Sequence, residues 1–209
     1  MATLQALLSS PDQSVRLKAA LAAGTYPEFE YIDILVSQCA HEPDFFVRDT
    51  LSWALMRNDI PAVVERLKFE LNSKNPLARS QAIHTLSKIG NKDNFPLITD
   101  EHFFDLDDAV ATTAWRAASV LVPESEKPLL VAKLITQLGR GDSDIQFALT
   151  RFLCAIGEEI VIPLKQAAQS LDETIRTQAD FTLMRYNEMK LENEREKPIV
   201  GRDLDSEHG

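Results

Sequence analysis

The sequence has few cysteines and no long apolar run, although 44% of its 209 residues are hydrophobic. Cys39 and Cys154 are the only cysteines, and they lie far apart without a C-x-x-C pair. We expect two buried, reduced thiols rather than a disulfide or a pair of metal ligands. No stretch reaches the roughly 18 apolar residues of a membrane-spanning helix. The amino-terminal segment also lacks the basic stretch and apolar core of a secretory signal, so a cytoplasmic location is expected.

Basic residues are too few to balance the acidic ones. The chain has 22 lysines and arginines against 32 aspartates and glutamates, which gives a formal net charge of −10. Such a surface repels a phosphate backbone on average, whereas nucleic-acid-binding proteins are usually basic over at least one face. The charge therefore argues against nucleic acid as a partner, although a local basic groove stays open.

Motifs for several common chemistries are missing as well. The sequence contains no G-x-S-x-G nucleophile elbow, no glycine-rich phosphate loop and no histidine or cysteine spacing typical of zinc. No Asn-Gly or Asp-Gly dipeptide marks a β-hairpin. We therefore predict a helical protein with no catalytic residue, no metal and no cofactor.

A pattern does recur in the sequence, at intervals of 30 to 35 residues. Its phase is marked by one apolar residue in each of six segments: Val15, Val47, Ala78, Val110, Ile145 and Ile175. Three residues before each marker stands a residue type that caps helix amino termini: Asp12, Asp44, Asn75, Asp107, Asp142 and Asp172. Apolar residues four and eight positions after each marker complete one stripe of an α-helix. Gly24, Gly90 and Gly157 follow three of the stripes as carboxy-terminal cap signals.

A second helical pattern precedes each marker helix, and prolines lie at or near the joints or in first turns. The sequence therefore predicts an all-α solenoid of about six two-helix repeats over residues 1–186. The predicted repeats cover residues 1–24, 28–58, 60–90, 94–122, 125–157 and 158–186. Residues 187–209 are expected to form a charged and mostly disordered tail, with helix persisting to about Arg195.

The marker helices resemble HEAT repeats, including the HEAT-like repeats of bilin lyases. The pattern Asp-x-x-Val-Arg-x-x-Ala, or a close variant, occurs in four segments: Asp12–Arg16, Asp44–Arg48, Asn75–Arg79 and Asp172–Arg176. Ala111 and Gln146 replace the arginine in two others. The resemblance implies a right-handed, armadillo-like superhelix in which the Asp and Arg residues form a structural ladder between repeats. It also implies that the second helix of each repeat lines a concave surface.

Helix geometry then selects the side chains of a candidate groove. At about 100° per residue, offsets +2, +6 and +9 from each marker point away from the buried stripe, with +5 at the border. The candidate groove residues are Asp49, Trp53, Met56, His84, Trp115, Arg116, Phe147, Arg151, Phe181 and Met184. His84, Arg116 and Arg151 share offset +6 and are expected to form a short basic strip. Arginines beside aromatic side chains favour a peptide with acidic groups or another anionic ligand.

A structural interpretation of the same residues stays open. In it, Trp53 and Phe181 pack into crevices between repeats, and Arg116 and Arg151 pair with neighbouring acids. A row of large apolar side chains along one surface nevertheless favours a binding site.

The favoured function is a non-enzymatic, monomeric scaffold that binds an extended or helical segment of another protein in the groove. The resemblance leaves open an enzyme or enzyme subunit that acts on an anionic small molecule, as a bilin lyase does. A HEAT-like DNA glycosylase would need a broadly basic groove, which the charge disfavours. A di-iron site like that of deoxyhypusine hydroxylase would need several His-Glu pairs, and this sequence has one, His41-Glu42.

Overall fold

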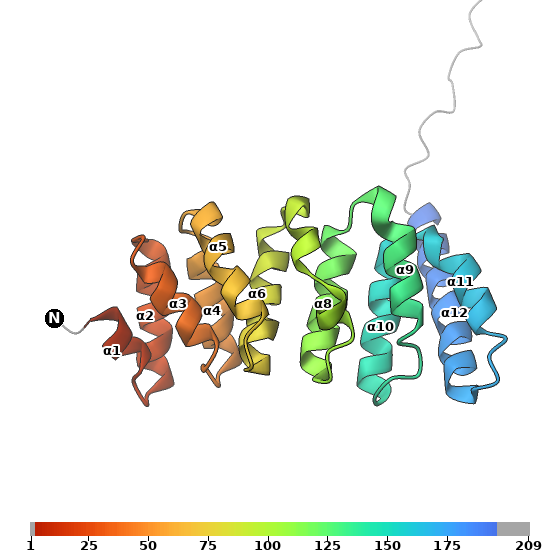
Figure 1. Ribbon diagram of the computed structural model, residues 1–209, viewed down its shortest axis with the longest axis horizontal. Helices are drawn as coiled ribbons and strands as arrows, with labels where there is room; N and C mark the ends of the chain where they lie inside the picture. The colour runs from red at the N-terminus through yellow and green to blue at the C-terminus, as the bar shows by residue number, and fades with distance from the viewer. Residues whose placement is uncertain (1–2, 196–209) are drawn as a thin grey trace, which may run out of the picture.

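The computed structural model describes residues 3–195, and all regular elements in that range are helices (Figure 1). The first helices of the repeats, three of them preceded by a 3-10 turn, are α1 (Leu4–Leu8), α3 (Tyr31–Cys39), α5 (Ile60–Leu71), η1 (Lys92–Leu97) with α7 (Asp100–Phe103), η2 (Glu124–Glu126) with α9 (Lys127–Ile135), and η3 (Glu158–Ile160) with α11 (Val161–Ala167). The second helices are α2 (Gln13–Thr25), α4 (Phe45–Leu55), α6 (Pro76–Ile89), α8 (Asp108–Leu121), α10 (Ser143–Ile156) and α12 (Glu173–Arg195).

The helix pairs stack in one row from the amino-terminal α1 to the carboxy-terminal α12 (Figure 1). Each second helix packs against the first helix of its own repeat and against the second helices of neighbouring repeats. The main contacts therefore join adjacent repeats, as expected for a quasi-one-dimensional repeat array. The predicted all-α class is confirmed, and the fold is a HEAT-like α-solenoid.

The second helices begin where the sequence places their caps. Each of the six Asp or Asn side chains accepts a hydrogen bond from a backbone N–H of the first turn, as from Ser14 to Asp12 at 2.8 Å and from Val47 to Asp44 at 3.0 Å. These bonds satisfy donors that have no partner inside the helix. Gly90 ends α6 in the left-handed conformation, with φ of 72°, which a glycine adopts without a steric cost.

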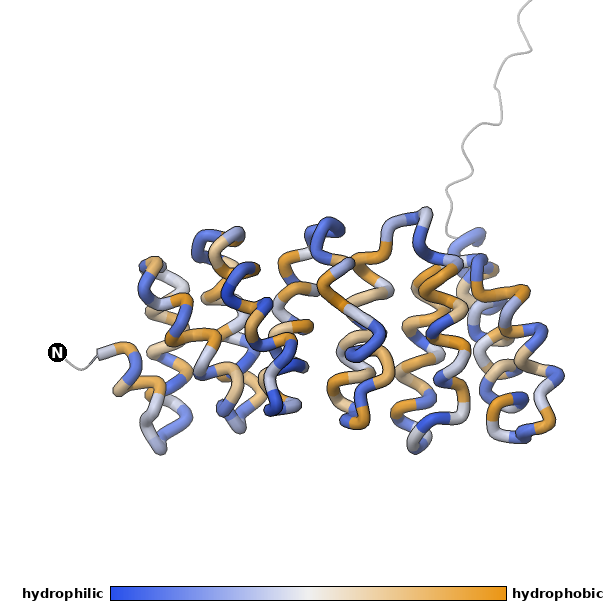
Figure 2. The backbone as a smooth tube through the Cα atoms, viewed as in Figure 1, coloured by the Kyte–Doolittle hydropathy of each residue, from blue (hydrophilic) through white to orange (hydrophobic). Residues whose placement is uncertain are grey.

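One continuous apolar core runs between the two helix layers. Val47, Leu51 and Leu55 on α4 are all fully buried, as the offsets 0, +4 and +8 predict. Hydrophobic and hydrophilic residues alternate along the helices (Figure 2), which is the pattern of amphipathic elements with one buried stripe. The core extends from Leu8 on α1 to Ala179 on α12.

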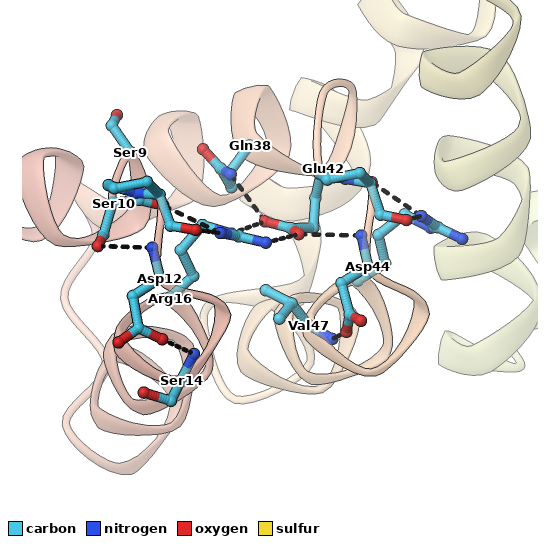
Figure 3. Close-up of polar contacts among 12 residues, drawn as sticks. Ser9, Ser10, Asp12, Ser14, Arg16, Gln38, Glu42, Asp44 and Val47 are labelled. Carbon is cyan, nitrogen blue, oxygen red and sulfur yellow. Dashed lines mark hydrogen bonds and ion pairs between the residues drawn. The ribbon is translucent and has the colours of Figure 1, made fainter.

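The ladder between repeats uses different acids from those expected. Arg16 donates to Glu42 with two bonds of 2.8 Å and also to the carbonyl of Ser10 (Figure 3). Glu42 is wholly buried and also accepts from Gln38 and from the backbone N–H of Asp44. The expected acid, Asp44, is occupied as a helix cap. The ladder acid therefore lies two residues before the cap, and the arginine role is structural, as the resemblance implied.

Glu42 stays ionised despite its burial. Burial is the largest influence on its pKa and raises it, but the hydrogen bonds from Arg16, Asp44 and Gln38, together with the charge of Arg16, bring the pKa below its usual value. The carboxylate is thus saturated by protein donors, and the adjacent His41 ring contacts the carbonyl of Ser37 instead. The His41-Glu42 pair is used for structure.

Helix α12 continues to Arg195, so residues 187–195 are helical rather than disordered. The helix was expected to persist to about Arg195, and α12 does so. The disorder predicted for residues 196–209 falls outside the described residues. Among residues 3–195, no helix combines the length and apolar character required to cross a bilayer.

Candidate binding surface

The ten candidate residues all lie on or directly after second helices of repeats two to six. Asp49, Trp53 and Met56 belong to α4 and its end, and His84 to α6. The remaining six lie on three helices: Trp115 and Arg116 on α8, Phe147 and Arg151 on α10, and Phe181 and Met184 on α12. Nine of the ten are at least partly accessible to solvent, and we call these nine the candidate surface.

Trp115 is the exception, and its prediction as an edge residue is wrong. The side chain is 0% exposed, and its indole N–H donates to the carbonyl of Phe103 at 3.0 Å. The guanidinium of Arg140 lies 5.6 Å from its ring. Offset +5 lies at the border of the buried stripe, and here the side chain turns inward because α7 supplies a carbonyl partner for the indole.

Trp53 is half-buried, and its contacts fit packing into a crevice between repeats better than a role in binding. Its ring packs so closely on α2 that a Cβ atom placed on Gly24 would lie 2.2 Å from Cζ3 of Trp53. Gly24 lies inside α2 rather than at its end, so its role as a cap signal is wrong. The glycine instead lets the indole fill the crevice between α2 and α4.

A chain of polar contacts crosses the middle of the candidate surface. Asp49 forms an ion pair with Lys88, and its carboxylate lies 3.8 Å from Nε2 of His84. The other ring nitrogen of His84, Nδ1, contacts the guanidinium of Arg116. Second helices of three successive repeats, α4, α6 and α8, are thereby linked.

His84 is neutral near pH 7, which corrects its place in the predicted basic strip. Burial, followed by the positive charges of Arg116 and Lys88, lowers its pKa to about 4. A neutral ring can accept the hydrogen bond from Arg116 at Nδ1. The histidine therefore orients the arginine and adds no charge of its own.

Arg116 and Arg151 have no carboxylate partner among residues 3–195. Burial, and then the charge of Arg151, lowers the pKa of Arg116, so the two guanidinium groups act on each other electrostatically. Arg151 is exposed, with its guanidinium 4.9 Å from the ring of Phe152. The structural interpretation had Arg116 and Arg151 pair with neighbouring acids, and within residues 3–195 neither arginine forms such an ion pair, so their positive charges stand close together.

An exposed aromatic pair lies beside these arginines. Phe147 and Phe181 pack edge to face, with ring centroids 5.2 Å apart and an interplanar angle of 78°. Phe147 is 59% exposed. Because the two rings belong to α10 and α12, they form a ridge across the joint between the last two repeats. This ridge is apolar, and Phe147 leaves most of its surface accessible to solvent.

Two hollows flank the aromatic ridge. One has a volume of about 540 Å³ and extends towards Gln146 and Thr177. The other has a volume of about 590 Å³ and extends along α12 to Arg185 and Met189, with Arg151 in its lining. Volumes of this size suit a side chain or a small ligand. Sequence reasoning missed Gln146, Arg185 and Met189, because it considered single helix faces and the hollows lie between two helices.

A search for metal ligands gives no candidate in the part of the chain that the structure describes. Nowhere in residues 3–195 do three or more His, Cys, Asp or Glu side chains gather closely enough to hold an ion. Cys39 and Cys154 are both buried and unpaired with each other.

No family model matches this sequence, and no curated protein does. Several solved structures match, and two of them follow. The crystal structure of an engineered protein shares 21% identity at a TM-score of 0.47, over 88% of this chain and 95% of that one. The complex of CpcE and CpcF of phycocyanin lyase from Nostoc sp. PCC7120 shares 18% identity at a TM-score of 0.36, over 89% of this chain and 95% of the other.

Proposed function

We propose that the protein is a binding scaffold whose candidate surface holds a segment of a partner protein that carries acidic groups. The observation that carries this proposal is the pair Arg116 and Arg151, which has no carboxylate partner within residues 3–195, although the chain has a net charge of −10. Unpaired arginines beside an apolar ridge are the composition of a recognition site, since arginines and aromatic residues dominate binding energies at interfaces.

The roles of the residues divide along the surface. Phe147, Phe181 and Met184 supply apolar contact area and the walls of two hollows. Arg116 and Arg151 supply donors for the partner's acidic groups. Trp53 and Asp49 contribute less, because the indole is packed on Gly24 and the carboxylate is paired with Lys88. Recognition would need no covalent step.

A displayed peptide library tests this function without knowledge of the partner. Peptides selected on the wild-type protein are expected to be enriched in aspartate or glutamate next to leucine, isoleucine or aromatic residues. The double variant Arg116→Glu, Arg151→Glu should lose the selected peptides. The charge-matched control Lys74→Glu, Lys165→Glu should retain them, since both lysines are exposed and neither forms an ion pair within residues 3–195.

Two outcomes would contradict the scaffold function. Selection that yields no consensus would remove the candidate surface as a peptide site. Equal binding by the arginine variant and the lysine control would show that the peptides bind elsewhere.

A second function is favoured by one observation, the size of the hollow beside Arg151. A volume of about 590 Å³ with an arginine in its wall suits an anionic small molecule. The absorbance spectrum and mass spectrum of the protein as purified would distinguish the two functions. A stoichiometric bound anion or chromophore would favour an enzyme or enzyme subunit over the scaffold.

A further inference from the structure

We infer that the site between Arg116 and Arg151 takes a phosphate monoester, carried by a phosphorylated side chain of the partner segment. This inference rests on the proposed function and narrows it, because it assigns one position of the segment to a phosphate instead of a carboxylate. It stands on the position of the two guanidinium groups, on the sum of charges around them and on the apolar ridge beside them.

The two arginines occupy equivalent positions on adjacent helices. Arg116 on α8 and Arg151 on α10 both stand six residues after their repeat markers. Packed helices lie about 10 Å apart, a gap that two arginine side chains can close onto one anion. The guanidinium groups already act on each other, since the charge of Arg151 is the largest charge effect at Arg116.

The two arginines together carry a charge of +2. Lys88 and Asp49 cancel in their ion pair, and His84 is neutral, so Arg116 and Arg151 remain uncompensated. One carboxylate would neutralise half of this charge. A phosphate monoester carries about −1.5 to −2 at pH 7 and offers three acceptor oxygens, which matches two bidentate donors.

Two acids line the hollow beside Arg151, and neither is paired with the arginines. Glu188 lines the hollow near Arg151 but is bound by Arg185 at 2.7 Å. Asp144 lines the same hollow seven residues before Arg151, which is about 10 Å along the helix axis. Neither acid forms an ion pair with Arg116 or Arg151.

His84 fixes the direction of one of the two arginines. Its Nδ1 accepts from the Arg116 guanidinium, and its Nε2 faces the carboxylate of Asp49. The hydrogen bond holds Arg116, which is half-buried, in place before a ligand arrives, and this preorganisation lowers the cost of binding. Arg151 is exposed and can move to complete the pair.

The aromatic ridge supplies the second half of the recognition. Phe181 and Arg151 line the same hollow, so a ligand bound by the arginine also meets apolar surface. Leucine or aromatic residues next to the phosphorylated residue would cover the exposed edge of Phe147. A peptide is therefore expected to bind more tightly than a free phosphate ester.

Nuclear magnetic resonance of the arginine Nε–H groups in the full-length protein tests the site. Phenyl phosphate is expected to shift the Arg116 and Arg151 signals in a saturable titration, with at least tenfold higher affinity than phenylacetate. A peptide with one phosphotyrosine between leucines should bind at least a further tenfold more tightly. The variant Arg116→Gln, Arg151→Gln should lose these responses, and the control Lys74→Gln, Lys165→Gln should keep them. Circular dichroism checks that both variants are folded.

Each contrary result has a separate meaning. Equal affinity for phenyl phosphate and phenylacetate would overturn the phosphate inference and leave the acidic-segment function standing. Equal affinity for phenyl phosphate and the phosphopeptide would overturn the claim that a partner segment carries the phosphate. The site would then be assigned to a small phosphate ester. Absence of a shift at either arginine with any of the probes would overturn the site itself, whereas the proposed function is judged by its own peptide selection.

Discussion

Second helices of adjacent repeats pack on each other, and we compare the first of these joints, between α2 and α4, with the last, between α10 and α12. The residue six positions after the marker has different surroundings at the two joints. Six residues after the marker, Trp53 packs against Gly24 and its indole fills the crevice. At the equivalent position on α12, Phe181 pairs with Phe147 and borders two hollows. The helix offset alone therefore does not decide between packing and binding. The contacts on the preceding helix differ, because Gly24 on α2 admits the Trp53 ring into the crevice whereas Phe181 packs edge to face on Phe147 of α10.

The two joints also differ in what holds them. Arg16 and Glu42 form a buried ion pair near the first joint, with Arg16 on α2. At the last joint, Gln178 bonds to the N–H of Gly139 and the carbonyl of Gln146, and Thr150 bonds to Thr182. The contacts that hold the last joint are neutral, and neither Arg116 nor Arg151 takes part in them. The comparison predicts that changes at the first joint affect stability and changes at the last joint affect binding.

The largest expected effect comes from Glu42→Gln. The change leaves the buried Arg16 without its charged partner, and loss of one member of a buried ion pair costs about 4 kcal/mol. Urea unfolding measures the loss. The matched control is Asp33→Asn, which breaks the exposed pair between Arg66 and Asp33 and should cost less than about 1 kcal/mol. Equal losses from the two variants would contradict the assignment of the buried ladder.

The next effect in size is expected from Gly24→Ala. The new methyl group would lie 2.2 Å from the Trp53 ring and 2.9 Å from the backbone of Ala54, so the two helices must separate. Overpacking of this kind costs about 3 kcal/mol. Adding Trp53→Ala should recover part of the loss in a double-mutant cycle. A fully stable Gly24→Ala protein would show that the crevice is not closed.

A smaller effect should appear as a pH dependence centred on His84. Its folded-state pKa of about 4 lies below its ordinary value of 6.5. The neutral His84 ring therefore contributes fully to the stability of the folded protein above pH 6.5, and this contribution is lost as the pH falls from 6.5 to 4. Since His84 is partly exposed, the expected loss in the free energy of unfolding is reduced to about 2 kcal/mol. The comparison is with His84→Gln, which cannot take up a proton, so carboxylate effects common to both proteins cancel. Identical pH profiles would contradict the neutral histidine.

The smallest effect on stability, and a large effect on binding, is expected from Phe147→Ala. The ring is 59% exposed, so the loss is mainly that of one aromatic pair, about 1 kcal/mol. A peptide selected on the wild-type protein should bind at least tenfold more weakly. Trp53→Ala is the complementary variant, with a large loss of stability and nearly unchanged peptide affinity. If Phe147→Ala lost mainly stability and Trp53→Ala lost mainly peptide binding, the roles given to the first and last joints would be wrong.

Local patterns in the sequence were sufficient for the fold. The caps Asp12 to Asp172 are contacts within one helix, and the position of the buried stripe follows from the period of one helix, so both occur where predicted. Local patterns did not identify Glu42 as the partner of Arg16. Two acids, Glu42 and Asp44, lie close to the ladder, and Asp44 matches the repeat pattern better.

The candidate surface was only partly predictable, because its shape depends on neighbouring repeats. Trp115 stands five residues after its repeat marker and Trp53 stands six after its own. Trp115 is nevertheless buried in the core, whereas Trp53 lies in the crevice between two helices. That difference depends on the carbonyl of Phe103 and on Gly24, which belong to other helices. The charge of His84 likewise depends on its burial and on Arg116 from the next repeat.

Hydrogen exchange of the wild-type protein with and without a selected peptide locates the bound segment on the solenoid. If the segment lies on the candidate surface, added protection appears in α8, α10 and α12, around Arg116, Arg151 and Phe181, with little change in α2 and α4. Protection confined to α2 and α4, or to the first helices α3, α5 and α9, would contradict this position of the segment.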